Sequence, residues 1–483
     1  MSETKASRRK FLQIAGTGVA ALAVGAAVGY YAGRIQAPSQ VVTETLTKTE
    51  TALTETATTE TGVPKPSSLT MGIVAGPEAT GIKAMAPVYE QATGIHIELP
   101  EYPYSALYEK FVTTFEAGAP TFDLIMSDDV WMPKWGSEGW LTELDTEFGV
   151  KAYENPDIPK TSYWLGSWPP PTGPVPPSDQ GKPRHVIGLS IVGNMKVFAY
   201  RTDLISTDPQ TWDDVMANAK KVNNPSQGIY GYVVRGAKGE PATMHFLSIM
   251  KSFGGDFFAD DWRIRLTDKE VIDALKFELE LLKLSPPGSE NFDAAERARA
   301  VAIGQAAQAQ TWPAELTDFI FNTEVSKVIG KVKVVPNPGR GELKSGAHTG
   351  NWLMGIPKSA APEKKYWAWN FMQWLLKPEV QREYALRGGI PVLKSIDADP
   401  ELQAKYPYQA ALLTAYESND ARIDRGQAVL AYPRTPELMS VVTIVGTYIN
   451  AALAGLETAE SAMQKAAQEL LDYLKAKGYP VYI

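Results

Sequence analysis

Two groups of carboxylates in this sequence occupy positions where α/β proteins place their ligands. Asp128 and Asp129 follow the apolar run 122–126, which is typical of a buried parallel strand. The carboxyl ends of such strands line the ligand crevice of α/β sheets. Glu78 lies in a Gly-Pro turn ahead of the first expected helix, which also faces a crevice. We expect one aspartate to accept hydrogen bonds from a ligand and the other to cap the next helix.

Aromatic residues are abundant, with 12 Trp and 21 Tyr. Flat rings beside carboxylates and amides are typical of sites for polyhydroxylated solutes, because the rings cover C–H faces and the polar groups meet hydroxyls. Most rings in a chain of this size pack in the core. Trp367, Trp369 and Trp374 share one expected helix and are predicted to be such packing residues.

The residue patterns of several catalytic and metal sites are missing. The chain contains no Cys, which excludes disulfides, thiolate metal sites and Cys nucleophiles. Its four His, at positions 96, 185, 245 and 348, lack the spacing of metal ligands. No phosphate-binding loop, H-E-x-x-H or G-x-S-x-G sequence occurs. We therefore expect no catalytic residue, no metal, no cofactor and no enzymatic activity.

Length and charge narrow the class of protein. The chain has 483 residues, and about 415 remain after its N-terminal region, enough for two domains. The net charge is −8, and the folded part has no cluster of Lys and Arg. A nucleic-acid partner is not expected, because binding to a phosphate backbone needs a basic surface.

The N-terminal segment 1–37 has the layout of an export signal. The sequence S-R-R-K-F-L at 7–12 closely resembles the twin-arginine export motif and precedes an uncharged stretch at 11–33. As a helix these 23 residues span roughly 35 Å, enough to cross a bilayer. The candidate cleavage site at 35–37 precedes Pro38, which disfavours cleavage. We expect the segment to remain as a membrane anchor.

Residues 38–67 are expected to form an extended linker. The part from 43 to 61 holds ten Thr and four Glu in nineteen residues, too little apolar surface to offset the entropy of ordering. A Thr-rich stalk after an anchor holds a domain away from a membrane, an arrangement found in many archaeal binding proteins. Glycosylation of the Thr residues stays open.

The remaining chain alternates predicted strands and helices. A strand at 68–74 precedes a helix whose apolar residues have helical spacing and which Gly94 ends. A strand around Ile97, a helix from Ser105 and the strand at 122–126 follow, and this β-α-β-α-β order predicts a mostly parallel sheet. A second set, with a strand at 229–234, indicates a second α/β lobe.

Read in order, short motifs along most of the folded chain resemble those of the family 1 extracellular solute-binding proteins, the maltose/trehalose-binding class of ABC importers. The resemblance covers about 68–478. Each motif is weak alone, and it is their order that carries the resemblance. The motifs are F-D-L-I (122–125) with D-D (128–129), E-G-W-L-T-E-L-D (138–145), I-G-L (187–189), F-A-Y-R-T-D-L (198–204), P-Q-T-W-D-D (209–214), G-G (254–255), G-Q-A-A (304–307), T-W-P (311–313), V-P-N-P-G (335–339), N-W-L-M-G-I-P-K (351–358) and G-G-I-P (388–391).

The resemblance implies a type II periplasmic-binding-protein fold. Its two lobes, each with a mostly parallel sheet flanked by helices, would be joined by a hinge and would close on a ligand in the cleft. Lobe 1 would hold 69–188 and 350–394, and lobe 2 would hold 189–349 and 395–483. The implied function is capture of a mono- or oligosaccharide outside the cell and its delivery to a membrane permease. We expect a monomer.

The resemblance also implies which residues contact the ligand. Trp312, before Pro313, and Trp352 match positions where the family stacks tryptophans on sugar. Together with the carboxylates and weaker candidates, the expected ligand-binding set is Glu78, Asp128, Asp129, Trp131, Asn194, Glu240, Trp312, Asn351 and Trp352.

Two alternatives remain from the sequence. A related binding protein could take a non-sugar solute such as a polyamine or a metal ion; the only Tyr-Tyr pair, at 30–31, lies in the export segment and disfavours iron. A secreted carbohydrate-active enzyme would also need aromatic rings and two carboxylates, for which Glu78 and Asp128 are candidates.

Overall fold

The computed structural model describes residues 62–483, which belong to one compact unit. The predicted export segment and most of the predicted linker lie outside the described residues. Within the described part, no helix combines the length and apolar character needed to span a membrane.

The larger sheet has six strands in the order β2-β1-β4-β11-β7, with β3 also paired to β1. β1 pairs in parallel with β2, β3 and β4, whereas β11 runs antiparallel to both β4 and β7. The predicted β-α-β-α-β order and the mostly parallel arrangement are confirmed for this sheet. Its strands are β1 (Ser68–Val74), β2 (His96–Glu98), β3 (Glu101–Tyr102), β4 (Leu124–Asp128), β7 (Leu189–Val192) and β11 (Trp352–Gly355).

The helices that follow β1 and β3 form where the sequence predicts them. α4 (Thr80–Thr93) buries Ile82, Met85 and Tyr89 on one face. Gly94 ends it in the left-handed conformation at φ 73°, which glycine adopts without steric cost. α5 (Tyr104–Glu116) packs on β1. Both helices place their N-termini near the carboxyl ends of the strands.

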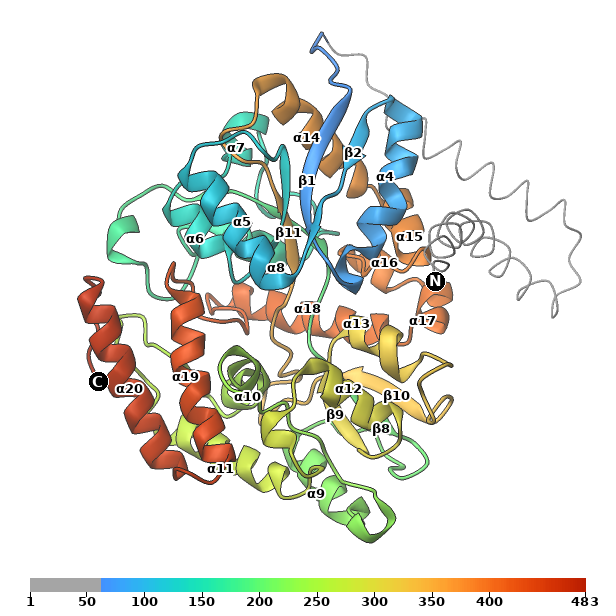
Figure 1. Ribbon diagram of the computed structural model, residues 1–483, viewed down its shortest axis with the longest axis vertical. Helices are drawn as coiled ribbons and strands as arrows, with labels where there is room; N and C mark the ends of the chain where they lie inside the picture. Colours follow the sequence, from blue (N-terminus) through green and yellow to red (C-terminus); the bar gives the residue numbers. More distant parts are fainter. Residues whose placement is uncertain (1–61) are drawn as a thin grey trace, which may run out of the picture. The chain divides into compact units, whose positions relative to one another are not determined.

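Further helices, labelled in Figure 1, and a two-stranded ribbon complete this part of the molecule. They are α6 (Met132–Ser137), α7 (Leu144–Phe148), α8 (Lys160–Leu165), α14 (Pro362–Leu375), α15 (Pro378–Leu386), α16 (Lys394–Asp397) and α17 (Pro400–Lys405), with the ribbon β5 (Ser167–Trp168) and β6 (His185–Val186) and the 3₁₀ turns η1 (Pro77–Ala79) and η2 (Pro177–Asp179).

The smaller sheet has the order β10-β8-β9 and is antiparallel throughout. Its strands are β8 (Val197–Arg201), β9 (Gln308–Thr311) and β10 (Val332–Pro336). The prediction of a mostly parallel sheet is therefore wrong for the second lobe. The expected strand at 229–234 makes a single parallel bridge, from Tyr230 to Ala306. Two residues further along, the amide of Tyr232 donates to the carbonyl of Leu284, which follows a helix and belongs to no strand.

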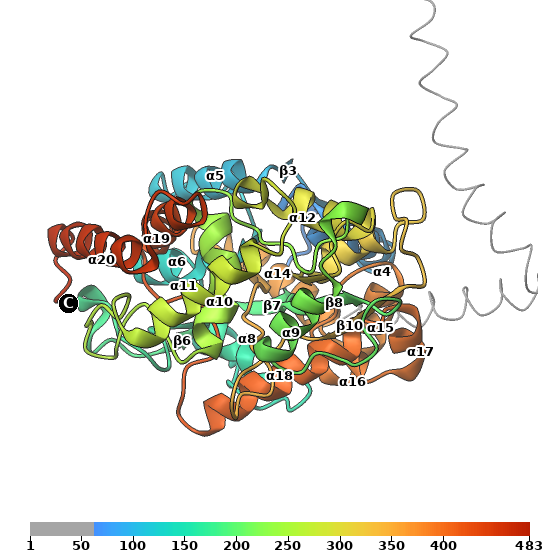
Figure 2. The same cartoon turned by 90° about the horizontal axis from the view of Figure 1, so that it is seen from below.

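Helices surround the smaller sheet, and α18 (Gln409–Asp424) contacts both α8 and β10 (Figure 1). The C-terminal pair α19 and α20 packs on α10 and α11, and the two views agree on this arrangement (Figures 1 and 2). The bounds are α9 (Trp212–Val222), α10 (Glu240–Ser252), α11 (Lys269–Leu282), α12 (Ala294–Ala302), α13 (Pro313–Glu315), α19 (Leu438–Leu453) and α20 (Ala459–Ala476), with the short turns η3 (Pro225–Gln227), η4 (Ser289–Asn291) and η5 (Leu316–Ile320).

The chain passes from the larger sheet to the smaller one between β7 and β8 and returns between β10 and β11. These two crossovers are hydrogen-bonded to each other: the amide of Gly350 donates to the carbonyl of Asn194 at 2.9 Å, and the amide of Lys196 donates to that of His348 at 3.1 Å. The paired crossovers hold Asn194 and Gly350 side by side between the two sheets.

Candidate functional site

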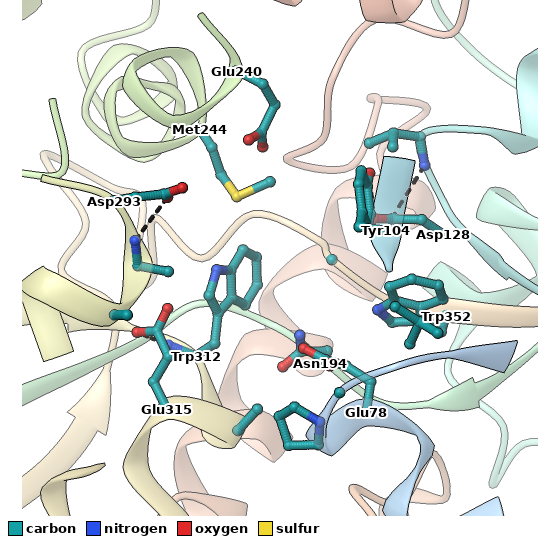
Figure 3. Close-up of a pocket in the computed structure, with 18 of the residues that line it drawn as sticks. Glu78, Tyr104, Asp128, Asn194, Glu240, Met244, Asp293, Trp312, Glu315 and Trp352 are labelled. Carbon is teal, nitrogen blue, oxygen red and sulfur yellow. Dashed lines mark hydrogen bonds between the residues drawn. The ribbon is translucent and has the colours of Figure 1, made fainter. Parts of the chain in front are cut away.

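A cavity of about 550 Å³ lies between the two sheets, where strands end and neighbouring helices begin (Figure 3). Asp128 ends β4, Trp352 begins β11, and Asn194 lies on the first crossover. From the other side, Glu240 begins α10 and Trp312 follows β9. The remaining polar and aromatic residues of its wall are Glu78, Tyr104, Ser105, Arg235, Met244, Asp293, Glu315, Asp318, Phe319, Thr349 and Tyr432.

Asp128 and Trp352 form one wall because they are direct partners across β4 and β11. The Tyr104 hydroxyl donates to Asp128 Oδ2 at 2.9 Å. The Tyr104 ring also meets Trp352 edge-on, with 6.0 Å between ring centroids. Burial, and then the adjacent charge of Asp129, raise the pKa of Asp128 well above its ordinary value. This carboxyl can therefore act as an acceptor and, when protonated, as a donor toward a hydroxyl.

Asp129 does not line the cavity, although the sequence could not separate it from Asp128. Successive side chains at a strand end point to opposite faces, so only one of the two can face the ligand side. Asp129 accepts the Asn351 amide at 3.2 Å, and Arg434 donates to its carbonyl at 2.8 Å. Burial raises its pKa to about 6, against the lowering effects of Thr349 and Arg434. It does not cap α6, whose N-cap is Trp131 without a side-chain hydrogen bond.

Asn351 and Trp131 lie behind the wall of the cavity for related reasons. Asn351 precedes Trp352 and points away from it, where its amide nitrogen donates to Ser190 Oγ at 3.1 Å and to the Tyr416 hydroxyl at 3.0 Å. The Trp131 ring packs against Trp352 at 5.5 Å between centroids and is 1% exposed. Both residues support Trp352 and do not reach the cavity.

Trp312 is held tightly on the opposite wall. Pro313 begins α13 directly after it, which fixes the direction of the chain at this point. On one face of the ring lies Lys196, with Nζ 3.9 Å from the ring centroid, and His348 meets the ring edge-on at 5.3 Å. A Cβ on Gly350 would lie 2.5 Å from Trp312 Cη2, so the ring position depends on glycine there. One face of the ring is left for a ligand.

Lys196 itself is fully buried, and its Nζ has no hydrogen-bond partner among the described residues. Burial, followed by the nearby charge of Arg297, lowers its pKa well below the ordinary value. The carboxylate of Glu315, which forms an ion pair with Arg297, has the opposite effect and raises the pKa of Lys196. The Lys196 Nζ lies against the Trp312 ring behind the cavity surface.

The wall near α10 is built around Arg235. Its guanidinium contacts Asp293 at 2.7 Å and Glu240 at 3.6 Å. Met244 lies beside it, one turn along α10 from Glu240 (Figure 3). Burial raises the pKa of Glu240 despite the nearby guanidinium, and its Oε1 has no hydrogen-bond partner. This wall therefore holds two carboxylates, those of Glu240 and Asp293, against one guanidinium.

Glu78 and Asp318 lie on a third side of the cavity, on η1 and η5. Burial raises the pKa of Glu78, and partial desolvation raises that of Asp318, which is otherwise exposed. Neither makes an ion pair within residues 62–483. Asn194, 5% exposed, lies between the two tryptophans in the close-up, and its Oδ1 is without a hydrogen-bond partner (Figure 3). Carboxylates without an ion pair thus line the cavity together with the amide of Asn194.

Six of the nine expected residues therefore line one cavity: Glu78, Asp128, Asn194, Glu240, Trp312 and Trp352. Sequence reasoning missed Tyr104, Arg235, Met244, Asp293, Glu315, Asp318 and Tyr432. Some signals existed: Tyr104 begins α5 directly after β3, and Asp293 is the N-cap of α12. Arg235, by contrast, lies in irregular backbone where periodicity carries no information.

Two further observations bear on the chemistry of the described part. No group of three His, Asp or Glu side chains in it is arranged to hold a metal ion. A second, smaller cavity of about 310 Å³ lies on the larger-sheet side and is lined by residues such as Trp135, Trp168 and Lys358. It contains none of the nine expected residues.

Comparison with known proteins places the chain in a family. The profile of the bacterial extracellular solute-binding proteins matches residues 75–382. A probable amino-acid ABC transporter periplasmic-binding protein of Sinorhizobium fredii is 27% identical over 408 residues, covering 82% of this chain and 88% of the relative.

Solved structures agree. The ABC transporter solute-binding protein of Agrobacterium radiobacter K84 in complex with ribitol is 25% identical with a TM-score of 0.69, covering 84% of this chain and 99% of that one. The maltose-bound MalE3 of T. maritima gives 26% identity, a TM-score of 0.69 and the same coverage. The chain, with its two sheets joined by paired crossovers and a cavity between them, belongs to the bacterial extracellular solute-binding protein family and has the type II periplasmic-binding-protein fold.

Proposed function

We propose that this protein captures a sugar or sugar alcohol in the cavity between its two sheets and delivers it to the permease of an ABC importer. The observation that carries the proposal is the wall itself: two tryptophans, Trp312 and Trp352, with the carboxylates of Glu78 and Asp128 and the amide of Asn194 around one space. Rings cover the C–H faces of a polyol and acceptors receive its hydroxyl protons.

The size of the cavity and the ligands of similar proteins support this proposal. Its volume of about 550 Å³ falls within the range of about 300–1,000 Å³ that is usual for small-molecule sites. The similar structures from A. radiobacter and T. maritima hold ribitol and maltose. A mono- or short oligosaccharide fits this range.

An amino acid, the ligand class in the name of the S. fredii relative, is a weaker candidate. Its α-carboxylate needs a cationic or amide-rich partner. Arg235, the one cationic side chain of the cavity wall, is already engaged by Asp293 and Glu240. The excess of carboxylates around it opposes a second anionic group.

We propose ligand contacts for the six cavity-lining residues of the expected set, and supporting roles behind the wall for Asp129, Trp131 and Asn351. The lobes of the proposal are those expected from the sequence, 69–188 with 350–394 and 189–349 with 395–483, and they close on the ligand by bending at the paired crossovers. Family members are binding proteins, and we propose binding without turnover, as a monomer.

We further propose export through the twin-arginine motif at 7–12, retention of 11–33 as an anchor, and a Thr-rich stalk of the archaeal type. The protein would then act on the outer face of the cell membrane. The double substitution Arg8→Lys with Arg9→Lys should leave the chain in the cytoplasm, because the paired guanidinium groups are the recognition element. Normal surface levels of the double variant would contradict the twin-arginine proposal. A mature N-terminus between 33 and 45, found by mass spectrometry, would contradict the anchor.

Calorimetric titration of the purified chain tests the central proposal. The panel contains ribitol, mannitol, glucose, maltose and longer maltosaccharides, with amino acids as the competing class. Saturable binding of a sugar or polyol, recovered unchanged after incubation, is the expected result. Saturable binding of amino acids alone, or conversion of the sugar, would overturn it.

A further inference from the structure

The cavity wall carries more negative than positive charge. Six carboxylates line it, from Glu78, Asp128, Glu240, Asp293, Glu315 and Asp318, against the single guanidinium of Arg235. Two of the carboxylates are neutralised by direct partners: Asp293 pairs with Arg235 at 2.7 Å, and Glu315 pairs with the buried Arg297 behind the wall.

Within residues 62–483, the other four carboxylates lack a cationic partner of their own. Glu240 shares Arg235 with Asp293 and lies 3.6 Å from it. Asp128, Glu78 and Asp318 make no ion pair within residues 62–483. The Lys196 ammonium cannot serve them directly, because the Trp312 ring lies against it. The cavity is thus an acidic space enclosed on opposite sides by aromatic rings.

The hydrogen-bonding groups of the wall are also unbalanced. The amide oxygen of Asn194 and Oε1 of Glu240 are shielded from solvent and have no donor. The Tyr104 hydroxyl proton is already used by Asp128, and the Arg235 guanidinium contacts Asp293, Met244 and Glu240. The hydroxyls of Thr349 and Tyr432 also lack a partner within residues 62–483 and can donate, but the wall carboxylates outnumber them. A ligand that supplies more donors than acceptors therefore suits this space best. An ammonium group donates three hydrogen bonds and accepts none, whereas a hydroxyl donates one.

The aromatic walls favour the same kind of ligand. The faces of Trp rings attract cations as well as C–H groups. The face of Trp312 opposite Lys196 and the ring of Trp352 both border the cavity. Burial raises the pKa of Glu78, Glu240 and Asp318, as happens where carboxylates are desolvated without sufficient countercharge.

We propose that the solute captured by this cavity is a polyhydroxylated molecule that carries a basic amine, such as an amino sugar or an amino-alditol, and that its ammonium group is received by the unpaired carboxylates. This inference rests on the proposed function and specifies its substrate class. The hydroxyl-bearing part stacks on the tryptophans, while the ammonium supplies the charge and the donors that the wall lacks.

The test compares matched ligands by calorimetry on the full chain at pH 7 and low salt. The pairs are glucose with glucosamine, galactose with galactosamine, and sorbitol with 1-amino-1-deoxysorbitol; N-acetylglucosamine is the neutralised control. A charged hydrogen bond gives at least about a tenfold preference for the amine in the pair whose skeleton fits. We expect this preference, its decline with added salt and its loss on N-acetylation.

Variants locate the effect. Glu78→Gln and Asp318→Asn should each reduce the ratio of amine affinity to neutral affinity toward one. The matched control Glu417→Gln, an exposed carboxylate on α18, should keep the wild-type ratio. A ratio in both cavity variants equal to that of the wild type would contradict the inference.

The outcomes separate the two proposals. Neutral sugars or polyols that bind as tightly as their amines overturn the amine inference and leave the proposed function standing. Binding of simple diamines such as putrescine with the same affinity as the amino sugars overturns the polyhydroxylated part. No binding by any member of the pairs or the wider sugar panel contradicts the proposed function, and the inference with it.

Discussion

Substitution of Trp312 by Ala is the perturbation whose effect can be derived most fully from the structure. The ring is 8% exposed, and Lys196 covers its far face, so a ligand stacks on one face only. We take the lower end of the range for aromatic hot spots, about 2 kcal/mol, which corresponds to a loss of about 30-fold in affinity. Removal of the ring also opens Lys196 to the cavity and to water, and the loss of burial returns its pKa toward the ordinary value, so that the group is charged there. An ammonium-bearing ligand then meets a like charge and loses more than a neutral one.

Calorimetry on three variants measures these two effects separately. Trp312→Ala should weaken the binding of a neutral polyol by about 30-fold and that of an amine-bearing polyol by more. The double variant Trp312→Ala with Lys196→Met also removes the charge. In this variant the amine-bearing ligand should lose no more affinity than the neutral one. Trp367→Ala is the control: the buried Trp367 in α14 donates to the Pro64 carbonyl at 3.0 Å, and neither residue lines the cavity, so its loss should lower Tm and leave affinity unchanged. If Trp312→Ala binds every ligand normally once folded, the ring is a packing residue and the reasoning fails.

Two further predictions concern residues beside and behind the wall. Gly350→Ala should weaken ligand binding by about tenfold with a smaller change in Tm, because the new Cβ would lie 2.5 Å from the Trp312 ring and displace it. Calorimetry and thermal unfolding of the same sample measure both effects. Unchanged affinity would show that Gly350 does not set the position of the ring. Burial raises the pKa of Asp129 to about 6 from 3.8, so protonation stabilises the folded state: the contribution is fully present below about pH 4 and is lost as pH rises through 6. Asp129→Asn should therefore gain Tm relative to the wild type between pH 5 and pH 7.5, and a relative Tm that is flat or falling over this interval would contradict the assigned shift.

The larger sheet and the family could be predicted from the sequence because their signals are local and periodic. The strand at 68–74, the helix ended by Gly94 and the buried strand before Asp128 each follow from spacing within one segment. The direction of the smaller sheet could not be predicted, since it depends on which distant strands pair with β8. No local pattern at 229–234 predicts that the amide of Tyr232 donates a hydrogen bond to the carbonyl of Leu284.

The site could be predicted in part for the same reason. Trp312 and Trp352 carried a motif, and Asp128 stood at a strand end, but the side of the strand that faces the cavity depends on register. Thus Asp129 and Asn351, each one position away from a cavity residue, lie behind the wall and do not line the cavity. Arg235 and Asp318 line the cavity because of tertiary packing, and the sequence around each residue does not predict that packing.

A structure of the chain with the best-binding solute tests the central claim most directly. The account predicts that the ligand lies between Trp312 and Trp352, with hydroxyl or ammonium protons on Asp128, Glu78 or Asn194. A ligand found instead in the smaller cavity beside Trp168 and Lys358, with the space between the two tryptophans unchanged, would contradict it.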